Sequence, residues 1–422
     1  MAATFAWAVL VIVLVLVGSG RVPIHLAAVA GLMVLGFAGV APLAVVFAGY
    51  GHPALVTIVA VFLMTQGVIN SGLLLGLGQD VGRRVKTLKA QVLTFAGVGA
   101  LLSALMNNVG AVGLLIPTGV RMAKRFGAAP GTFGLPLAMG SILGGTLTLI
   151  GSSANIIVAS VMLQRTGTSF RMFDFLFHGS AMLITASVIW WVCWACGINP
   201  GSGESRSGEV DDEDLPPEEE LHLAPFASRA RQLTLGVLGA AILAVAIADV
   251  HPALGFGGAV LILFASGVLE TGKALKQVDW KVVLFLGAML GMGEVLSETG
   301  GLDQLAQLLL PMVAGWSPTG LVLGLILTST LLASGVNNAA AAVFMAPLAA
   351  GIAEASDLTV SAALMAVAAG SNMAFLFPTH QAVLIVRSWA PFSISAFMRA
   401  GLILTVFCGA AAAAVILMVW QH

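Results

Sequence analysis

The feature that most constrains this chain is a series of long apolar runs that almost no charge interrupts. Hydrophobic residues make up 59% of the 422 residues and charged residues only 9%, whereas about a quarter of a soluble domain is charged. Since a helix needs roughly 20 apolar residues to cross a bilayer, the sequence predicts an all-α polytopic membrane protein. The net charge of −1 argues against nucleic acid as a partner.

Each half of the chain has the same order of predicted segments. The first repeat covers 1–198, the second covers 232–422, and 199–231 is a polar linker rich in acidic residues, Pro, Gly and Ser. The predicted segments, in chain order, are spans at 4–18, 24–40 and 54–78, a hairpin at 91–121, a broken span at 132–165 and a span at 177–197, then spans at 233–250, 254–270 and 281–297, a hairpin at 318–353, a broken span at 358–389 and a span at 398–420.

The two hairpins contain matching asparagine pairs. Asn107 and Asn108 stand in "MNNVGAVGLLIP", and Asn337 and Asn338 stand in "VNNAAAAVFMAP". Each predicted repeat crosses the membrane an odd number of times, so the second repeat must be inverted relative to the first. The sequence thus predicts two inverted-topology repeats, each with a re-entrant hairpin and a broken transmembrane helix.

The distribution of positive charge agrees with this inversion, except that Arg165 and Arg171 fall outside in this scheme. Basic residues flank the first hairpin at both ends, namely Arg83, Arg84, Lys86, Lys89, Arg121, Lys124 and Arg125. The second hairpin has no Lys or Arg close to it. Because cytoplasmic loops are enriched in Lys and Arg, we expect the first hairpin and the 199–231 linker to face the cytoplasm and the second hairpin to open outside.

The asparagine pairs mark where one half-helix ends and the next begins. Non-helical backbone at membrane depth persists only where it faces protein or a watery cavity. The free N–H groups of the second half-helix favour an anion, whereas the freed carbonyls and the Asn and Ser oxygens are hard ligands that suit Na⁺ better than a transition metal. A lone Asn in a membrane helix would instead form an interhelical hydrogen bond.

The broken spans supply the other wall of each predicted site, through "GSSAN" at 151–155 and "PTHQ" at 378–381. Neither segment contains Lys or Arg, so the charge of an anion must be met by helix N-termini and by cations bound with it. The predicted Na⁺ ligands are Asn107, Ser152, Ser153, Asn155, Asn337 and Thr379. The predicted substrate-binding residues are Asn108, Asn338, His380 and Gln381. We find no catalytic constellation and expect no enzyme activity.

Two titratable residues leave open a second interpretation of how transport is coupled. His380 changes charge near neutral pH and could transfer protons, or it could donate a hydrogen bond to the substrate. Glu294, in "GAMLGMGEVLSE", is a carboxylate within a predicted span and is a functional candidate for that reason. Proton-coupled anion transport, cation/proton antiport or arsenite-type export is therefore the alternative to Na⁺ coupling.

These motifs resemble the divalent-anion:sodium symporter family of the ion transporter superfamily, over nearly the whole chain. "GGTLTLIGSSANIIV" is similar to the family's Gly-Thr-Ser-Thr-Asn region, and "FLFPTHQAVLIV" resembles a Pro-Thr-Ser-His-Gln variant. Both hairpin tips keep the family's asparagine but lack the threonine that follows it there.

The resemblance implies how the protein works. Family members are homodimers that act as elevators, in which a transport domain slides against a scaffold while carrying sulfate or a dicarboxylate together with sodium. It implies an integral membrane protein of the bacterial inner membrane. The family usually has eleven spans, whereas the segments above give ten, so the side of the N-terminus stays open.

Overall fold

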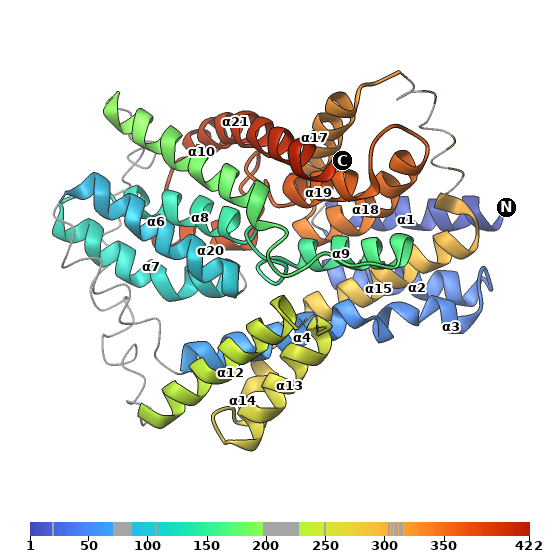
Figure 1. The fold of residues 1–422 in the computed structure, drawn as a ribbon, viewed down its shortest axis with the longest axis horizontal. Coiled ribbons are helices and arrows are strands. Elements are labelled where there is room, and N and C mark those ends of the chain that lie inside the picture. Colours follow the sequence, from blue (N-terminus) through green and yellow to red (C-terminus); the bar gives the residue numbers. More distant parts are fainter. Residues whose placement is uncertain are drawn as a thin grey trace.

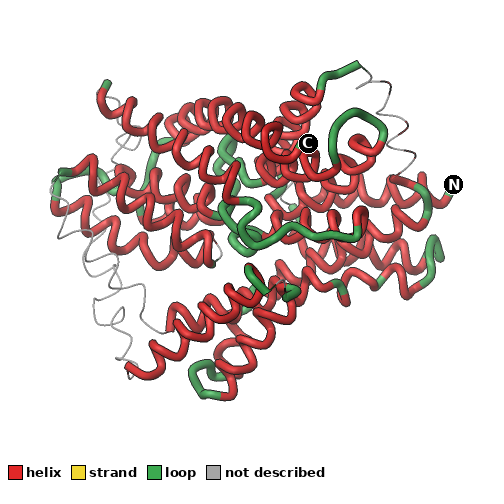
Figure 2. The backbone as a smooth tube through the Cα atoms, viewed as in Figure 1, coloured by secondary structure: helices red, strands yellow, loops and turns green. Residues whose placement is uncertain are grey.

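The computed structural model describes residues 1–18, 21–70, 87–106, 108–196, 228–248, 250–302, 304, 307, 311 and 315–422. Within these residues the backbone forms helices and loops and no strand (Figure 2). The expected all-helical fold is confirmed. Most of the predicted linker, up to residue 227, lies outside the described part of the chain, as do Arg83, Arg84 and Lys86.

The described helices differ widely in length. Those of the first half are α1 (Ala2–Gly18), α2 (Ile24–Phe37), α3 (Leu43–Val46), the 3-10 helix η1 (Ala48–Gly51), α4 (Pro53–Asn70), α6 (Leu88–Leu105), α7 (Asn108–Arg125), α8 (Gly131–Gly144), α9 (Ser153–Thr166) and α10 (Leu176–Ala195). Those of the second half are α12 (Ser228–Ala246), α13 (Pro252–Ala265), α14 (Thr271–Gln277), α15 (Trp280–Glu298), α17 (Pro318–Gly335), α18 (Asn338–Glu354), α19 (Val360–Ser371), α20 (Gln381–Trp389) and α21 (Ile394–Trp420). In the described residues, α6, α10, α15, α17 and α21 are long and apolar enough to cross a membrane.

Several helices are short because the chain breaks between them. Non-helical segments separate α8 from α9 at 145–152 and α19 from α20 at 372–380. The helices before both breaks pack unusually close to a neighbour. A Cβ atom on Gly144 would lie 2.1 Å from the Ala100 carbonyl oxygen of α6, and one on Gly370 would lie 2.4 Å from the Ile326 oxygen of α17. Glycine therefore permits the α6–α8 and α17–α19 contacts.

The contacts between helices follow one pattern in both halves. α6 packs on α8 as α17 packs on α19, and α7 packs on α20 as α18 packs on α9. α10 and α21 lie against each other (Figure 1). Exchanging the two halves leaves this set of pairings unchanged. Each hairpin thus contacts the half-helix that follows the break of the other half.

The remaining helices pack beside this set in two groups. α1, α2, α3 and α15 lie together, and α4 packs with α12, α13 and α14 (Figure 1). α4 contacts α9, and α15 contacts α18. Helices of both groups therefore lie beside the place where the two helix breaks and the two hairpin turns come together.

Candidate functional site

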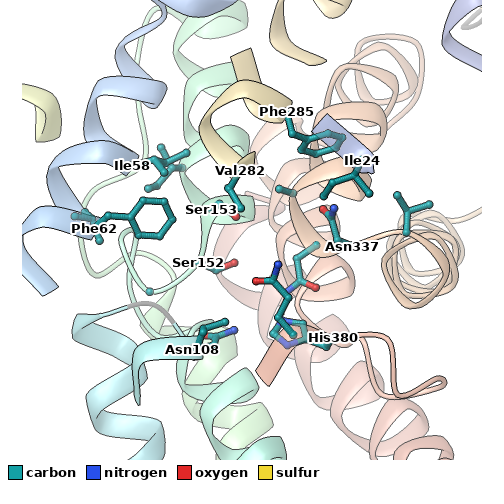
Figure 3. A pocket seen from close by; sticks show the side chains of 18 of the residues that line it. Ile24, Ile58, Phe62, Asn108, Ser152, Ser153, Val282, Phe285, Asn337 and His380 are labelled. Atoms are coloured by element: carbon teal, nitrogen blue, oxygen red, sulfur yellow. The ribbon is translucent and has the colours of Figure 1, made fainter. Parts of the chain in front are cut away.

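The two helix breaks and the two hairpin turns surround one cavity of about 290 Å³ (Figure 3). Its polar lining residues are Asn108, Ser152, Ser153, Asn337, Asn338, Thr379, His380 and Gln381. Apolar side chains from α2, α4 and α15 complete the wall, among them Ile24, Phe62 and Phe285. No Asp, Glu, Lys or Arg lines this cavity in the described part of the chain. The structure therefore brings eight of the ten predicted site residues together around a space without charged side chains.

Four helices begin at this cavity. The first residues of α7, α9, α18 and α20 are Asn108, Ser153, Asn338 and Gln381, and all four line it. The first N–H groups of a helix lack intrahelical partners, and the N-terminus has a partial positive charge. Four such ends around one space favour a bound anion without any cationic side chain.

Two predicted residues do not line the cavity. Asn107 lies outside the described residues. Asn155 is fully buried, and its Nδ2 donates to the Gly145 oxygen at 3.0 Å and the Thr148 oxygen at 2.8 Å. Its Oδ1 accepts a hydrogen bond of 2.8 Å from Asn372 Nδ2. Asn155 thus fastens the 145–152 segment to the second half of the chain.

On the first-half side of the cavity, the polar groups bond to one another. Asn108 Oδ1 accepts a hydrogen bond of 2.6 Å from Ser103 Oγ, and Thr148 Oγ1 donates to the Ala104 carbonyl oxygen. Ser152 caps α9, because its Oγ accepts from the Ala154 N–H at 3.3 Å. Of these bonds, the one from Thr148 joins the C-terminal end of α6 to the 145–152 segment.

On the second-half side, several polar atoms have no partner. Asn337 caps α18 by accepting from the Ala340 N–H at 2.8 Å, and Thr379 Oγ1 donates to the Ser334 oxygen at 2.7 Å. The Oδ1 atom of Asn338 and the Oγ atom of Ser334 are buried without a hydrogen-bond partner. Buried polar atoms of this kind need an explanation, and a ligand in the cavity would supply one.

The orientation of His380 defines a pair of donors. His380 Nδ1 accepts the Ala382 N–H at 3.2 Å and so caps α20. A neutral ring that accepts at Nδ1 has its hydrogen on Nε2. This Nε2 lies 3.3 Å from Asn338 Nδ2, which is itself a donor. Asn338 Nδ2 also donates a long hydrogen bond of 3.5 Å to Asn372 Oδ1. Its second N–H and the His380 Nε2–H face each other without an acceptor between them, an arrangement suited to the oxygen of an anion.

The sequence did not point to Ser103, Thr148 or Asn372. Asn372 stands in "GSNMAF", shortly before the predicted "PTHQ" break. An asparagine is unusual in an apolar segment, so the sequence alone could have indicated this residue. Ser103 precedes the first asparagine pair by less than two helical turns. The apolar wall could not be found in this way, because isoleucine and phenylalanine are common throughout the chain.

Apolar helices that break around a polar cavity are typical of an integral membrane transporter. The chain belongs to the CitMHS family of citrate transporters, whose model matches residues 10–370. The expected membership of the ion transporter superfamily is thereby confirmed.

Named relatives share parts of the sequence. An uncharacterized transporter of Mycobacterium tuberculosis is 30% identical over 239 residues, which is 54% of this chain and 52% of the relative. Sodium/sulfate cotransporter 1 of Chlamydomonas reinhardtii is 31% identical over 140 residues, covering 31% of this chain and 16% of the relative. The chain thus spans less than two thirds of the length of these relatives. Bacterial relatives such as the first fit a location in the plasma membrane.

Solved structures share the fold at low sequence identity. The transporter YdaH of Alcanivorax borkumensis has a TM-score of 0.64 and 15% identity, covering 88% of this chain and 86% of that one. MtrF of Neisseria gonorrhoeae, described with a class of antimetabolite efflux pumps, has a TM-score of 0.60 and 12% identity, covering 88% and 82%. These likenesses concern the fold alone.

Proposed function

We propose that this protein is a secondary active transporter that moves a divalent anion, sulfate or a small dicarboxylate, together with Na⁺ through the cavity described above. The observation that supports this proposal most is that four helix N-termini meet at a cavity where no described residue contributes a charged side chain. Helix ends attract an anion, but a divalent anion in a site without a cationic residue needs further positive charge. Co-bound Na⁺ ions would provide it.

The anion would bind mainly to the second-half side. The Asn338 amide and the His380 Nε2–H form the facing donor pair, and Gln381 at the start of α20 extends the polar wall. Hydrogen bonds to a charged group stabilise a complex by about 1.5–3 kcal/mol each. An anion oxygen between Asn338 and His380 would accept from both donors.

The Na⁺ ions would bind where neutral oxygens converge. On the first-half side these are the Ser152 and Ser153 hydroxyls. We add Asn108 Oδ1, which accepts from Ser103 and which the sequence analysis assigned to the substrate. The sequence-based assignment of Asn107 as a ligand is kept in this proposal. On the second-half side they are the oxygens of Asn337 and Thr379, beside the unpartnered Ser334 hydroxyl. Asn155 would position the 145–152 carbonyls rather than meet the ion itself.

Movement would follow the inverted-repeat, elevator scheme that the resemblance implies. The contact pattern that is unchanged when the halves are exchanged supports two equivalent repeats. In this scheme α6–α10 and α17–α21 would move as a transport unit against the remaining helices, within a homodimer. Bound Na⁺ would tie each hairpin turn to its neighbouring break, so that a neutralised site crosses the membrane.

The names of relatives bear on coupling and substrate. Two relatives are named as sodium/sulfate cotransporters, which supports Na⁺ and sulfate, while the family description names citrate. A proton-coupled exchanger or exporter is the alternative, and it would need a titratable carboxylate. None lines this cavity in the described residues.

Calorimetric titration of the purified protein tests the proposed ligands. Sulfate, succinate and citrate would be titrated in Na⁺ buffer and in matched K⁺ buffer. We expect one of these anions to bind in Na⁺ and to bind at least ten times more weakly in K⁺. Equal affinity in both buffers would remove Na⁺ from the proposal, and no binding of any of them would remove the substrate class.

A further inference from the structure

The polar and the apolar lining of the cavity come from different helices. Its polar residues all stand at the N-termini of α7, α9, α18 and α20 or within two residues of them. In Figure 3 the labelled apolar side chains of the other helices lie above Asn108 and His380. The proposed function uses only the polar residues. The residues contributed by α2, α4 and α15, which we call the apolar wall, are Ile24, Ile58, Val61, Phe62, Val282 and Phe285.

Half of the apolar wall belongs to a tightly packed part of the protein. Ile58, Val61 and Phe285 are 3%, 5% and 1% exposed. Behind them, α15 packs so closely on η1 that a Cβ atom on Gly49 would lie 2.2 Å from the Gly287 carbonyl oxygen. Closely packed side chains have little freedom to turn away from a ligand. The wall therefore stays apolar and keeps its shape when the cavity is occupied.

The other half of the wall borders open space. Ile24, Phe62 and Val282 are partly exposed, and all three line the cavity. In the elevator scheme α4 and α15 belong to the stationary part, so an apolar face on them could serve sliding alone. A face with that single role would be covered by the helices that slide on it. Here the cavity separates the wall from the helix N-termini, and either water or part of a ligand must fill it.

The cavity is large for sulfate. A water molecule occupies about 30 Å³ in the liquid, so a cavity of about 290 Å³ has room for roughly ten of them. Sulfate has no apolar surface, and bound at the polar residues it would leave water against the wall. Replacing such water with apolar atoms is favourable. A cavity lined by apolar side chains with a few polar groups is typical of sites for organic ligands.

We propose that the apolar wall determines substrate specificity, and that it selects a dicarboxylate with an apolar substituent over sulfate and over an unsubstituted dicarboxylate. This inference rests on the proposed function, because it concerns the anion in the same cavity. One carboxylate would accept from Asn338 and His380, and the other would lie near the N-termini of α7 and α9. The substituent would pack against Ile24, Phe62 and Val282.

The composition of the wall indicates which substituent fits best. Phe62 and Phe285 bring aromatic rings to the cavity from α4 and α15 (Figure 3). Aromatic rings attract each other beyond the gain from buried area, so a phenyl group should be preferred to a methyl group. A hydroxyl group would lose water at the wall and gain no hydrogen bond there. The wall thus discriminates against hydroxylated dicarboxylates of the same size.

Calorimetric titration of the purified protein in saturating Na⁺ tests the proposal with sulfate, succinate, methylsuccinate, hydroxysuccinate and phenylsuccinate. We expect methylsuccinate to bind about fourfold more tightly than succinate, the effect of burying one CH₂ group, and phenylsuccinate more tightly still. Hydroxysuccinate, which has the size of methylsuccinate, should bind more weakly than succinate. Equal affinities for the four dicarboxylates, or tighter binding of sulfate, would overturn this inference and leave the proposed function in place. Binding of none of the five anions would overturn both.

Substitutions in the wall test its role through the ratio of phenylsuccinate affinity to succinate affinity. Phe62→Ala should lower this ratio about tenfold, and Val282→Thr, which keeps the shape of the side chain but adds a hydroxyl, about threefold. Phe177→Ala and Val192→Thr are the matched controls, because both side chains are exposed on α10 outside the cavity. A variant that still binds succinate is folded, so the ratio separates lost selectivity from lost structure. An unchanged ratio in Phe62→Ala, or an equal fall in Phe177→Ala, would exclude the apolar wall as the selecting surface.

Discussion

The two sides of the proposed anion cavity are built from equivalent elements, yet they differ in how their polar groups are used. Ser152 and His380 are equivalent caps, since each accepts from the N–H two residues later at the start of α9 or α20. Asn108 and Asn338 are equivalent first residues of α7 and α18. Asn108 Oδ1 is bonded to Ser103, whereas Asn338 Oδ1 has no partner.

This difference suggests a division of labour. The first-half side is already bonded and presents hydroxyl and carbonyl oxygens, so it suits a small cation that needs a preformed site. The second-half side presents the His380 Nε2–H and the Asn338 amide, which donates to Asn372 at 3.5 Å and has a second N–H facing His380, so it suits the anion. The predictions below break or sharpen this contrast and run from the largest expected effect to the smallest.

Asn155→Leu should lower stability most. The change removes the donors to the Gly145 and Thr148 oxygens and the acceptor for Asn372, all of them buried. Each buried group left unpaired costs about 1–3 kcal/mol, so we expect a loss of about 4 kcal/mol. Thermal unfolding in detergent measures it, with Gln381→Leu as an exposed control within about 0.5 kcal/mol of wild type. Equal unfolding temperatures for the two variants would contradict the fastening role.

Asn338→Ala should weaken anion binding about 100-fold, because a charge-assisted hydrogen bond of about 2.7 kcal/mol is lost. Na⁺ affinity measured without anion should stay within about threefold of wild type. His380→Asn, which retains a side-chain cap but lacks the ring donor, should also weaken anion binding. Titration of the anion in saturating Na⁺ measures the effect. A normal anion affinity in both variants would move the anion away from the second-half side.

Asn108→Ala should weaken Na⁺ binding and leave anion binding nearly unchanged, the opposite of Asn338→Ala. We expect the half-saturating Na⁺ concentration to rise about tenfold, or roughly 1.4 kcal/mol, while anion affinity in saturating Na⁺ changes little. Na⁺-dependent thermal stabilisation gives the readout, because a ligand that binds only the folded state raises its stability. If Asn108→Ala and Asn338→Ala had the same profile, the two sides would not differ in function.

Ser152→Ala should lower stability only slightly. Loss of the cap on α9 costs about 1 kcal/mol, which thermal unfolding can detect. Ser153→Ala is the matched variant, since Ser153 is the first residue of α9 and does not cap it. We expect it to lower Na⁺ affinity with less than about 0.5 kcal/mol of lost stability. Equal destabilisation by the two variants would remove the capping role.

The helix breaks were predictable from sequence because polar residues stand out in an apolar chain. "NN", "GSSAN" and "PTHQ" mark places where helices end or begin, and residues of all three motifs line the cavity. The predicted boundaries were less accurate. The break near 151–155 extends back to residue 145, because glycines at 144–145 signal close helix packing as readily as a helix end.

The contacts between the halves could not be predicted. Asn155 was expected to meet an ion, but its amide is occupied by the chain itself and by Asn372. Its counterpart in the second half is Val383, so no internal repeat signals the pair. The pair of facing donors at His380 and Asn338 likewise depends on which ring nitrogen of His380 caps α20. The spacing of residues in a sequence does not determine this.

The central claim is that Na⁺ supplies the charge that the anion cavity lacks. Uptake of labelled sulfate and labelled succinate into proteoliposomes, with an inward Na⁺ gradient and with Na⁺ replaced by K⁺, tests it most directly. Our account predicts uptake of one of these anions that collapses when the Na⁺ gradient is removed and is lost in His380→Asn. Uptake that ignores Na⁺ and follows a pH gradient would contradict it and favour the proton-coupled alternative.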